Sequence, residues 1–370
     1  MNKIAHITTV HSRSDSRIFS KQCATLAAAN FGTVALFVAD GQGDSESQGV
    51  KIFDIGRSEG RLRRFLSGSY KMFKALRGYK ADVVHFHDSE LIPLGLTLRA
   101  FGVKVVYDVH EDLPRDILIK EYIPYFLRRL ISSAAEFVEW VGGQFFSGIV
   151  TATPVIASRF PSKKTLVVCN FPIQEEFALN CELAYPARPK SFCYVGTISE
   201  ARGPLELVNA MAIMPSDCRL TLAGSFNTQE LECKARSLKG WARVYFLGWV
   251  SRKDVSQVLG ASRAGMVTLL PTQTHLDSYP IKLFEYMAAG LPVVASDFPL
   301  WRDILEGVEC AVFVDPANPG EIAKAMKWLL DNPSEAEAMG QAGKRAIEER
   351  INWAVEGEKL LAFYRQHLLG

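Results

Sequence analysis

The stretch at residues 277–296, DSYPIKLFEYMAAGLPVVAS, contains the signals for a helix, for the end of that helix and for a following strand. Proline is favoured in the first turn of a helix, and Pro280 stands at that position. Gly290 suits the C-terminal cap of the same helix. Residues 292–295 form a short apolar run, which is typical of a buried strand in a parallel sheet. The stretch therefore predicts a short helix that leads into the sheet of an α/β domain.

The predicted helix has two faces with different chemistry. Its apolar residues are spaced to face the sheet, whereas Lys282 and Glu285, three residues apart, share another face. A lysine in the first turn opposes the helix dipole, and a diphosphate bound at the helix N-terminus would account for it. Glu285 has the chemistry to accept hydrogen bonds from two vicinal hydroxyls, such as those of a ribose. The alternative is an ordinary salt bridge between the two side chains on an exposed face.

The rest of the chain repeats this pattern of short apolar strands separated by helical segments. In the first half, the predicted strands are residues 3–10, 33–38, 50–55, 82–87, 103–109, 149–153 and 165–169. In the second half, they are residues 191–195, 219–223, 243–247, 265–269, 292–295 and 311–314. Such alternation predicts parallel sheets covered by helices on both faces. We therefore expect an α/β protein of two doubly wound, Rossmann-like domains.

The chain length and the distribution of proline indicate where these domains divide. A chain of 370 residues is long enough for two domains of ordinary size. Residues 171–190 combine prolines with polar residues and have no clear period, so we interpret them as a linker. We expect an N-terminal domain at 1–170, a C-terminal domain at 191–350 and a helix at 351–370 that packs back on the first domain. Two facing sheets would place a substrate in the cleft between the domains.

Composition and charge argue against several classes of protein. Hydrophobic residues make up 48% of the chain, charged residues 22%, and the net charge of +2 gives no reason to expect a nucleic acid partner. The seven cysteines include no C-x-x-C pair, so we expect reduced thiols and no zinc site. We find no signal-peptide pattern at the N-terminus and no apolar stretch long enough to span a bilayer. These features favour a cytoplasmic protein.

The charges are unevenly distributed between the two halves. Residues 1–180 carry 22 Lys and Arg against 18 Asp and Glu, whereas residues 181–370 carry 20 against 22. The excess is concentrated between Arg57 and Lys80, in a basic amphipathic segment of the kind that lies on an anionic membrane surface. We expect this segment either to contact a membrane or to form a solvated helix over the first sheet.

A second segment combines cations with aromatic side chains. Residues 122–146, which contain Arg128 and Arg129 among many aromatic residues, are a second candidate for contact with a membrane surface. Aromatic side chains at helical spacing are more often buried than exposed, so we expect these to belong to the core.

A second candidate site follows the predicted strand at 191–195. Gly196 allows the chain to turn sharply out of the strand, and Gly203 and Pro204 open the next helix. Arg202 stands at this junction of loop and helix, where its guanidinium group is able to bind a phosphate. Both candidate sites follow strands of the same domain, so we expect them to meet at one edge of its sheet.

These stretches make the chain resemble the retaining glycosyltransferases of family 4, which have the GT-B fold of two Rossmann-like domains. The acidic positions of the family's Glu-x7-Glu pattern correspond to Asp277 and Glu285, and its Gly-x-Pro-Val-Val-Ala segment corresponds to residues 290–295. The family's loop Gly-Arg-Leu-x3-Lys-Gly corresponds to residues 196–203. The resemblance covers essentially the whole chain, including FLGWV at residues 246–250.

The chain departs from the family's pattern at three positions. Thr197 stands where an arginine usually binds the diphosphate, so we expect Lys282 or Arg17 to supply that contact. Arg202 replaces a lysine and keeps its charge. Asp277 is one methylene shorter than the usual glutamate, which changes its contact with the transferred sugar.

The resemblance implies a set of site residues in both domains. His110, in YDVHEDLP at residues 107–114, corresponds to the family's active-site histidine near the transferred sugar. The residues expected to act in catalysis are His110, Arg202, Lys282 and Asp277. The residues expected to bind the donor are Gly196, Thr197, Arg202, Trp249, Val250, Tyr279, Ile281, Lys282, Glu285 and Arg17. We expect that Asp15 and Arg17 form a local ion pair or that Arg17 enters the cleft.

Two histidines have a spacing that suits a metal ion. His85 and His87 alternate along a predicted strand, so both side chains share one face. No third ligand is evident, and members of the resembled family generally need no metal for the chemistry. We therefore expect no metal site.

The resemblance also implies a reaction, namely transfer of a sugar from a nucleotide-diphosphate sugar to an acceptor with retention of the anomeric configuration. We expect a UDP- or GDP-sugar as donor substrate, no separate cofactor, and a lipid-linked or saccharide acceptor in the assembly of a cell-surface polysaccharide or glycolipid. The protein would then be cytoplasmic and peripheral on the inner face of the plasma membrane. Two alternatives fit the same pattern: a non-catalytic protein that binds nucleotide sugars, and a GT-B sugar-nucleotide epimerase.

Overall fold

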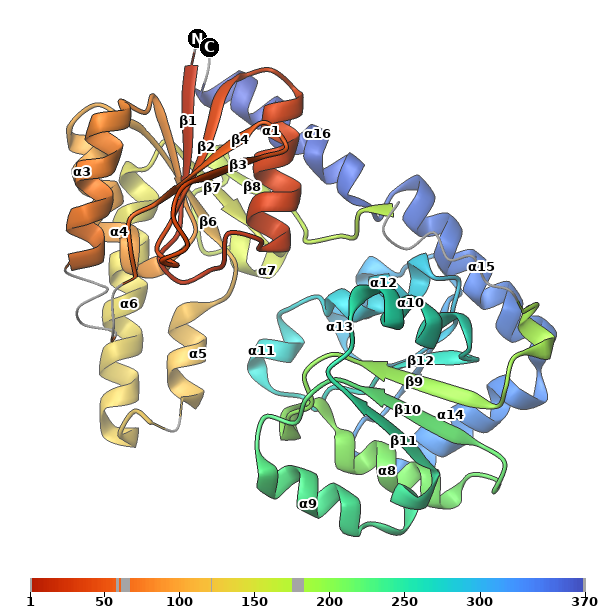
Figure 1. The fold of residues 1–370 in the computed structure, drawn as a ribbon. Coiled ribbons are helices and arrows are strands. Elements are labelled where there is room, and N and C mark those ends of the chain that lie inside the picture. Colours follow the sequence, from red (N-terminus) through yellow and green to blue (C-terminus); the bar gives the residue numbers. More distant parts are fainter. Residues whose placement is uncertain (1, 58–59, 61–66, 121, 175–182, 369–370) are drawn as a thin grey trace. The chain divides into compact units, whose positions relative to one another are not determined.

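The computed structural model describes residues 2–57, 60, 67–120, 122–174 and 183–368. The chain divides into two compact units (Figure 1). The first unit comprises Met1–Asn170 together with Trp353–Gly370, and the second comprises Phe171–Asn352. Among the described residues, no helix is both long and apolar enough to cross a bilayer.

The first unit is built around an eight-stranded sheet in the order β3-β4-β2-β1-β5-β6-β7-β8. Its strands are β1 (Asn2–Ile7), β2 (Gly32–Val38), β3 (Ser45–Ser47), β4 (Val50–Asp54), β5 (Val83–Phe86), β6 (Lys104–Val109), β7 (Gly148–Thr151) and β8 (Thr165–Val167). All neighbours are parallel except β3 and β4, which are antiparallel. The seven strands predicted in the first half are present. The polar, exposed edge strand β3 was not predicted.

The second unit is built around a six-stranded parallel sheet in the order β11-β10-β9-β12-β13-β14. Its strands are β9 (Ser191–Val195), β10 (Arg219–Ala223), β11 (Val244–Gly248), β12 (Ala264–Val267), β13 (Val293–Ser296) and β14 (Ala311–Val314). Each one overlaps a predicted strand. The predicted α/β class with two doubly wound sheets is confirmed.

Helices lie on the faces of both sheets (Figure 1). In the first unit they are η1 (Ser16–Cys23), α1 (Ala24–Ala28), α3 (Ser69–Tyr79), η3 (Ser89–Leu91), α4 (Ile92–Ala100), α5 (Leu113–Ile119), α6 (Tyr125–Phe145), α7 (Pro154–Ala157), η4 (Ser162–Lys164), α16 (Trp353–Phe363) and η9 (Tyr364–Leu368). In the second unit they are η6 (Tyr185–Ala187), η7 (Glu200–Arg202), α8 (Pro204–Ile213), α9 (Gln229–Ser237), η8 (Lys239–Arg243), α10 (Arg252–Gly260), α11 (Gln273–Leu276), α12 (Ile281–Ala288), α13 (Pro299–Ile304), α14 (Pro319–Asp331) and α15 (Pro333–Glu349). The helix predicted after Pro280 is α12.

The end of the chain belongs to the first unit. After α15 the chain continues as α16, which contacts η1 and α1. Trp353 Nε1 donates a hydrogen bond to Thr25 Oγ1 at 2.8 Å, and Glu356 accepts one from the backbone N–H of Cys169 at 2.8 Å. These bonds link residues more than 180 positions apart in sequence and fasten the C-terminal helix to this unit.

The basic segment between Arg57 and Lys80 is described only in part. Residues 58–59 and 61–66 lie outside the described residues. The described part forms α3, which buries Met72 and Leu76 in the core of the first unit and leaves Lys71 and Lys74 exposed. This part is a solvated helix over the first sheet, which is one of the two arrangements predicted for the segment.

The prediction that the aromatic residues of 122–146 belong to the core is wrong. Phe126 is 79% exposed and Phe137 is 63% exposed. The buried residues of α6 are instead Ser132, Glu139, Gly142 and Gly143. Helical spacing shows that apolar residues share a face, but only the neighbouring elements decide which face is covered.

Candidate active site

Most of the predicted donor residues of the second unit lie on segments that follow β9 and β12, two neighbouring strands. Gly196, Thr197 and Arg202 follow β9, whereas Lys282 and Glu285 lie on α12, after β12. A Cβ atom added to Gly196 would lie 3.8 Å from Lys282 Nζ and 3.9 Å from Arg202 Nη1. The two stretches singled out in the sequence therefore meet at one edge of the sheet.

Lys282 is a buried amine at this edge. The residue is 7% exposed, and its Nζ lies 3.6 Å from the centroid of the Tyr194 ring, with no hydrogen-bond partner among the described residues. Burial, reinforced by the nearby Arg202, holds the pKa of Lys282 well below its ordinary value, although Glu285 opposes the shift. The burial excludes the alternative of an exposed salt bridge. A buried amine of this kind forms an ion pair when an anion binds at the site.

Two glycines in the loop after β9 adopt backbone conformations that disfavour a side chain. Gly196 and Gly203 have φ values of 117° and 68°. A Cβ atom on Gly203 would lie 2.3 Å from the backbone oxygen of Thr268. Arg202 Nη1 donates a hydrogen bond to the carbonyl oxygen of Thr197 at 3.3 Å, which holds the guanidinium group over this loop. Thr197 thus contributes a backbone oxygen where the resembled family has an arginine side chain.

Asp277 and Tyr279 lie on the segment between α11 and α12. Asp277 accepts a hydrogen bond from Gln273 Nε2 at 2.6 Å. The ring of Tyr279 packs near Phe284 and Phe171, with centroids 6.0 and 6.3 Å apart. These contacts set the course of the chain into the first turn of α12, where Lys282 lies.

The remaining predicted donor residues lie at the surface of the same unit. Ile281 is 42% exposed at the start of α12. Trp249 and Val250 follow β11, and Trp249 is 79% exposed. Gly248, which ends β11, accepts a backbone hydrogen bond from Gly224 at 2.7 Å, so this loop adjoins the end of β10.

His275 belongs to this site and was not predicted. Its Nδ1 lies 2.9 Å from the carbonyl oxygen of Leu270. Burial lowers the pKa of His275, and the cations Arg202 and Lys282 lower it further, although the bond to Leu270 opposes the shift. A single histidine in a short helix has no spacing signal, so the sequence offered no means of placing it beside these cations.

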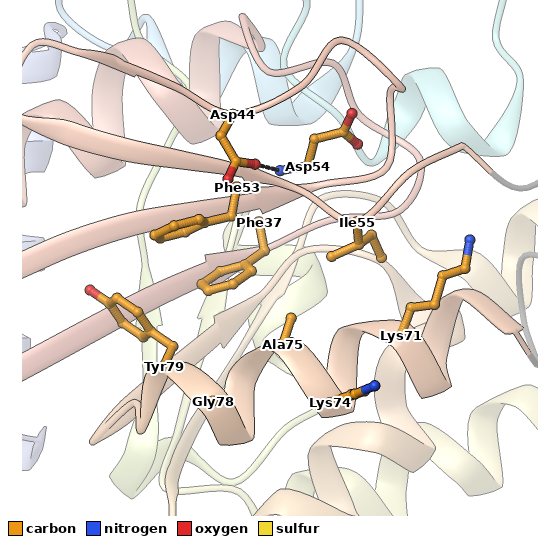
Figure 2. Close-up of a pocket in the computed structure, with 10 residues that line it drawn as sticks. All are labelled: Phe37, Asp44, Phe53, Asp54, Ile55, Lys71, Lys74, Ala75, Gly78 and Tyr79. Carbon is orange, nitrogen blue, oxygen red and sulfur yellow. Dashed lines mark hydrogen bonds between the residues drawn. The ribbon is translucent and has the colours of Figure 1, made fainter.

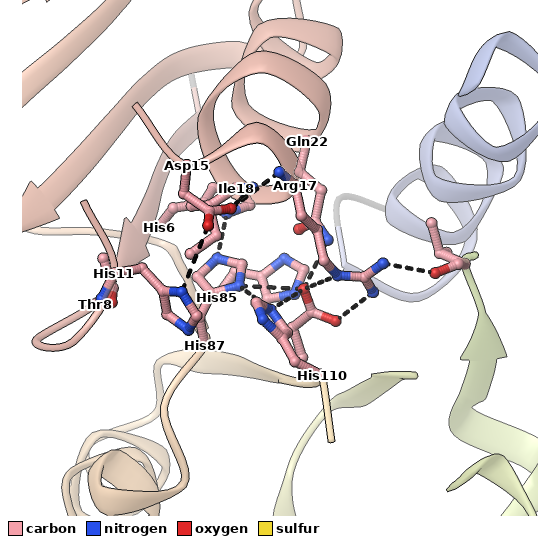
Figure 3. Close-up of polar contacts among 12 residues, drawn as sticks. His6, Thr8, His11, Asp15, Arg17, Ile18, Gln22, His85, His87 and His110 are labelled. Atoms are coloured by element: carbon pink, nitrogen blue, oxygen red, sulfur yellow. Dashed lines mark hydrogen bonds and ion pairs between the residues drawn. The ribbon is translucent and has the colours of Figure 1, made fainter. Parts of the chain in front are cut away.

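His110 lies at the end of β6, among polar side chains of the first unit (Figure 3). Its Nε2 lies 3.0 Å from Asp108 Oδ2 and 3.2 Å from His87 Nδ1. Burial opposes ionisation of Asp108, but Arg17 and His110 outweigh it and hold the pKa of this carboxyl well below its ordinary value. The ionised Asp108 orients the ring of His110, which remains partly exposed.

Arg17 adopts neither predicted arrangement. Its Nη2 and Nε donate to the two oxygens of Asp108 at 2.7 and 3.1 Å, and its Nη1 donates to the carbonyl oxygen of Val168 at 2.8 Å. Asp15 instead accepts from the backbone N–H groups of Arg17 and Ile18. The predicted Asp15–Arg17 ion pair is therefore wrong. Arg17 is buried within the first unit, where it supplies the charged partner that the buried carboxylate of Asp108 requires. The guanidinium group of Arg17 is therefore not free to contact a donor.

Three further histidines form stacked rings next to His110. His6 Nδ1 lies 3.0 Å from His87 Nε2, and His85 Nδ1 lies 2.8 Å from Tyr364 OH. The rings of His85 and His87 are stacked with centroids 5.0 Å apart. Burial lowers the pKa of His6, His85 and His87, so the three rings are neutral at pH 7.

These rings also bear on the question of a metal ion. Asp108 is a third potential ligand that the sequence did not reveal, since ligand atoms of His85, His87 and Asp108 lie within 4.8 Å of one another. Both oxygens of Asp108 accept hydrogen bonds from Arg17, and both nitrogens of His87 have partners. Asp108 and His87 are thus engaged in a hydrogen-bonded network, whereas His85 Nε2 is buried without a hydrogen-bond partner among the described residues. Because two of the three side chains are engaged in this way, we assign them no metal.

A cavity of about 500 Å³ opens beside His110 in the first unit. Its lining residues are Val10, His11, His87, Asp88, Ser89, Glu90, Tyr107, His110, Glu111, Leu113, Lys120 and Tyr122. Asp88 is held in place by Thr8 Oγ1, which donates to it at 2.9 Å. Burial raises the pKa of Glu111, and the neighbouring Asp116 raises it further. The cavity offers several carboxyl groups to a ligand and one lysine.

A second cavity, of about 640 Å³, lies between α3 and the strands β2 and β4 (Figure 2). Phe37, Phe53 and Tyr79 supply most of its aromatic lining, and Lys71 and Lys74 line it from α3. It contains none of the predicted site residues.

Residues 181–346 match the family model of the glycosyl transferases group 1. These residues therefore form a group 1 glycosyltransferase domain, and the chain is a glycosyltransferase. The glycosyltransferase is 25% identical over 281 residues to the D-rhamnosyltransferase WbpZ of Pseudomonas aeruginosa, a match that covers 74% of this chain and 70% of the relative. It is 31% identical over 184 residues to the phosphatidyl-myo-inositol mannosyltransferase of Mycobacterium leprae. That match covers 49% of this chain and 47% of the relative, about half of each.

Solved structures share the whole fold of the glycosyltransferase. Sucrose-phosphate synthase from Thermosynechococcus elongatus has a TM-score of 0.80 at 19% identity and covers 99% of each chain. HepE of Anabaena, in complex with UDP, has a TM-score of 0.74 at 13% identity and covers 99% of this chain and 100% of its own. The GT-B fold implied by the resemblance is confirmed.

The two groups of residues in the glycosyltransferase have complementary chemistry. Arg202 and Lys282 place two cations at the end of one sheet, where they suit an anionic group such as a diphosphate. His110 and Asp108 place an oriented imidazole at the end of the other sheet, next to a cavity rich in hydrogen-bonding groups. The described residues of either group present no side chain in the arrangement of an activated nucleophile, such as a serine or cysteine hydrogen-bonded to a base.

Proposed function

We propose that the glycosyltransferase transfers a sugar from a nucleoside-diphosphate sugar to an acceptor with retention of the anomeric configuration. The observation that carries this proposal is Lys282, a buried amine without a hydrogen-bond partner among the described residues, close to Arg202. Cleavage of a sugar–diphosphate bond leaves negative charge on the departing diphosphate. Fixed cations that are already desolvated stabilise that charge at the moment it develops.

The other donor residues hold the rest of the substrate in this proposal. Glu285 binds the ribose hydroxyls, and the N-terminus of α12 binds the phosphates. Asp277 and His110 orient the transferred sugar. The donor phosphate itself accepts the proton of the attacking hydroxyl, so transfer occurs on one face of the sugar and retains its configuration. A UDP- or GDP-sugar is the proposed donor, and no further cofactor takes part.

The acceptor binds in the cavity beside His110. Asp88, Glu90 and Glu111 are hydrogen-bond acceptors suited to sugar hydroxyls, whereas a phosphate would be repelled by ionised carboxylates. An uncharged sugar unit, free or at the end of a lipid-linked chain, fits this chemistry. The names of the relatives, a rhamnosyltransferase and a phosphatidyl-myo-inositol mannosyltransferase, support a place in polysaccharide or glycolipid assembly.

The location of the protein forms a separate part of the proposal. We place it in the cytoplasm, peripheral on the inner face of the plasma membrane. The segment between Arg57 and Lys80 was the predicted contact, and its described part offers Lys71, Lys74 and Arg77 as exposed cations. The apolar residues of this part are largely covered by the sheet, which leaves mainly electrostatic attraction to such a surface.

A thermal-shift screen against UDP-, GDP-, ADP- and TDP-sugars identifies the donor, because a ligand that binds the folded state raises the melting temperature. Product analysis with that donor then follows Lys282→Ala and Glu285→Ala. We expect turnover to fall by about a hundredfold or more in both variants. The matched controls are Lys324→Ala and Glu335→Ala, which change exposed residues of α14 and α15.

Two results would remove the proposal. Near wild-type turnover in either site variant would show that these residues do not bind the donor. A donor that binds but is never transferred, or one whose sugar is epimerised without an acceptor, would favour the two alternative functions.

A further inference from the structure

The helices α5 and α6 and their connection carry the main concentration of exposed apolar side chains in the described part of the chain. Of the twenty large hydrophobic residues that are exposed among the described residues, eleven lie between residues 118 and 145. This set, the aromatic face, comprises Leu118, Ile119, Tyr122, Tyr125, Phe126, Leu130, Ile131, Phe137, Val138, Trp140 and Phe145. Contiguous apolar patches are rare on soluble proteins unless they meet a partner.

The opposite side of α6 is fixed to the first unit, so the helix is not free to roll and cover this face. Ser132 Oγ donates a hydrogen bond to the carbonyl oxygen of Pro114 at 2.7 Å. Glu139 is buried and accepts from Arg159 Nη2 at 2.6 Å. Rolling the helix would separate a buried ion pair, which costs several kcal/mol.

Cations stand at the N-terminal end of the aromatic face. Arg128 donates to the carbonyl oxygen of Ile123 at 2.8 Å, and its guanidinium group lies 6.0 Å from the centroid of the Tyr125 ring. Arg129 is exposed beside it. Basic groups among aromatic side chains are typical of segments that lie in the headgroup region of a bilayer.

Cations also stand at the C-terminal end. Arg99 Nε donates to the carbonyl oxygen of Phe145 at 3.1 Å, and Lys164 Nζ donates to that of Gln144 at 2.6 Å. Burial lowers the pKa of Lys164, and the nearby Arg99 lowers it further, so the two cations are close. Along the exposed surface of α6, Glu136 is the single acidic residue among those described.

We propose that the aromatic face docks the glycosyltransferase on a bilayer that contains anionic lipids. Phe126, Leu130 and Phe137 enter the boundary of the acyl chains, while the tyrosines and Trp140 occupy the headgroup level. The helix lies in the plane of the membrane because its other side is attached to protein. A second copy of the chain is a poorer partner, since both ends of the face are cationic and either orientation of two faces brings cations together.

The aromatic face is continuous with the cavity beside His110. Tyr122 belongs to both, and Lys120, at the end of α5, also lines the cavity. Docking therefore brings this side of the cavity to the membrane surface. A lipid-linked acceptor sugar would then reach the cavity while its lipid stays in the leaflet. This consequence rests on the proposed function, whereas the docking itself does not.

Vesicle co-sedimentation without donor or acceptor tests the docking. The probes are vesicles of phosphatidylglycerol with phosphatidylethanolamine, and vesicles of phosphatidylcholine alone. We expect the wild type to pellet with the anionic vesicles, and the triple variant Phe126→Ser, Leu130→Ser, Phe137→Ser to lose about tenfold or more of that binding. All three side chains are exposed, so the thermal unfolding of the variant should match that of the wild type.

Two matched variants locate the surface. The first changes Ile213, Tyr245 and Trp328, exposed apolar residues of the second unit, to serine. The second changes Lys71 and Lys74 of α3 to glutamate. We expect the first variant to bind like the wild type and the second to retain most of its binding.

The result that overturns the proposal is a triple variant of α6 that pellets like the wild type. A wild type that does not pellet and is a dimer by light scattering, with the triple variant a monomer, would overturn it in favour of a second copy. Loss of vesicle binding with sugar transfer to a water-soluble acceptor unchanged would support the docking independently of the proposed function.

Discussion

Arg17 and Asp108 form a buried two-point ion pair, with Nη2 2.7 Å from Oδ1 and Nε 3.1 Å from Oδ2. The pair joins η1 to the end of β6, although its members are 91 residues apart in sequence. Asp108 Oδ2 also lies 3.0 Å from His110 Nε2. The orientation of His110 therefore depends on a contact that also stabilises the first unit.

Replacing Arg17 with methionine should destabilise the first unit strongly. The variant leaves the carboxylate of Asp108 buried without its main cation, and loss of one partner of a buried pair costs about 3–5 kcal/mol. Urea unfolding measures the change. The control is Arg13→Met, which breaks the partly exposed pair of Arg13 with Asp40 and should cost less than about 1 kcal/mol. Equal losses in the two variants would show that burial does not determine the strength of the Arg17 pair.

Local sequence patterns were sufficient for much of the fold and of the donor site. The strands were predictable because each is a short apolar run, and α12 was predictable because Pro280 and Gly290 mark its two ends. The meeting of Arg202 with Lys282 followed from their positions after strands of one domain. Parallel strands end at the same edge of a sheet, so this step needed no knowledge of packing.

Packing decided what the sequence could not predict. Arg17 was expected to pair with its neighbour Asp15, but its partner Asp108 is distant in sequence and becomes available only when the sheet forms. The aromatic residues of α6 have the spacing of a buried helix, yet α4 and α5 cover the other side. Spacing along one element carries no information about the neighbours that bury it.

The buried histidines should make the first unit sensitive to acid. His85 has its pKa held well below the ordinary value of 6.5 because of burial. Its ring stays neutral in the folded state while the unfolded chain takes up a proton below about pH 6.5, so stability falls as the pH decreases from 6.5 towards the folded pKa. Each such group contributes up to about 1.4 kcal/mol per pH unit.

His85→Gln isolates one of these groups. Glutamine can still form a hydrogen bond with Tyr364 OH, so the variant should lose about one proton from the pH dependence of the unfolding free energy between pH 6.5 and 5. Urea unfolding at several pH values gives that slope. His367→Gln, which removes a histidine at an exposed position on η9 of the same unit, is the matched control. An unchanged slope in His85→Gln would mean that the ring takes up its proton in the folded protein over the same pH range as in the unfolded chain.

His110→Ala should separate catalysis from donor binding. His110 lies in the first unit, whereas Arg202, Lys282 and Glu285 lie in the second. We therefore expect transfer to fall by about a hundredfold, with the thermal shift produced by the donor unchanged. Steady-state kinetics and the shift measured on the same preparation check the two expectations. A loss of donor binding equal to the loss of transfer would place His110 with the nucleotide and contradict its assignment to the sugar.

Lys282→Met should stabilise the protein while it removes activity. The pKa of Lys282 is held well below its ordinary value of 10.5 by burial, so the unfolded chain binds more protons than the folded one, and stability rises with pH between the folded pKa and 10.5. Methionine fills a similar volume without an amine to desolvate. We expect a gain of about 1–3 kcal/mol in the free energy of unfolding at pH 7, and a weaker dependence of that free energy on pH.

Turnover should fall by about a hundredfold or more, because the departing diphosphate loses a desolvated cation. Lys324→Met, on the exposed side of α14, should change neither the free energy of unfolding at pH 7 nor the turnover. A Lys282→Met variant that is both less stable and fully active would show that the amine is solvated in the folded protein and takes no part in binding the donor.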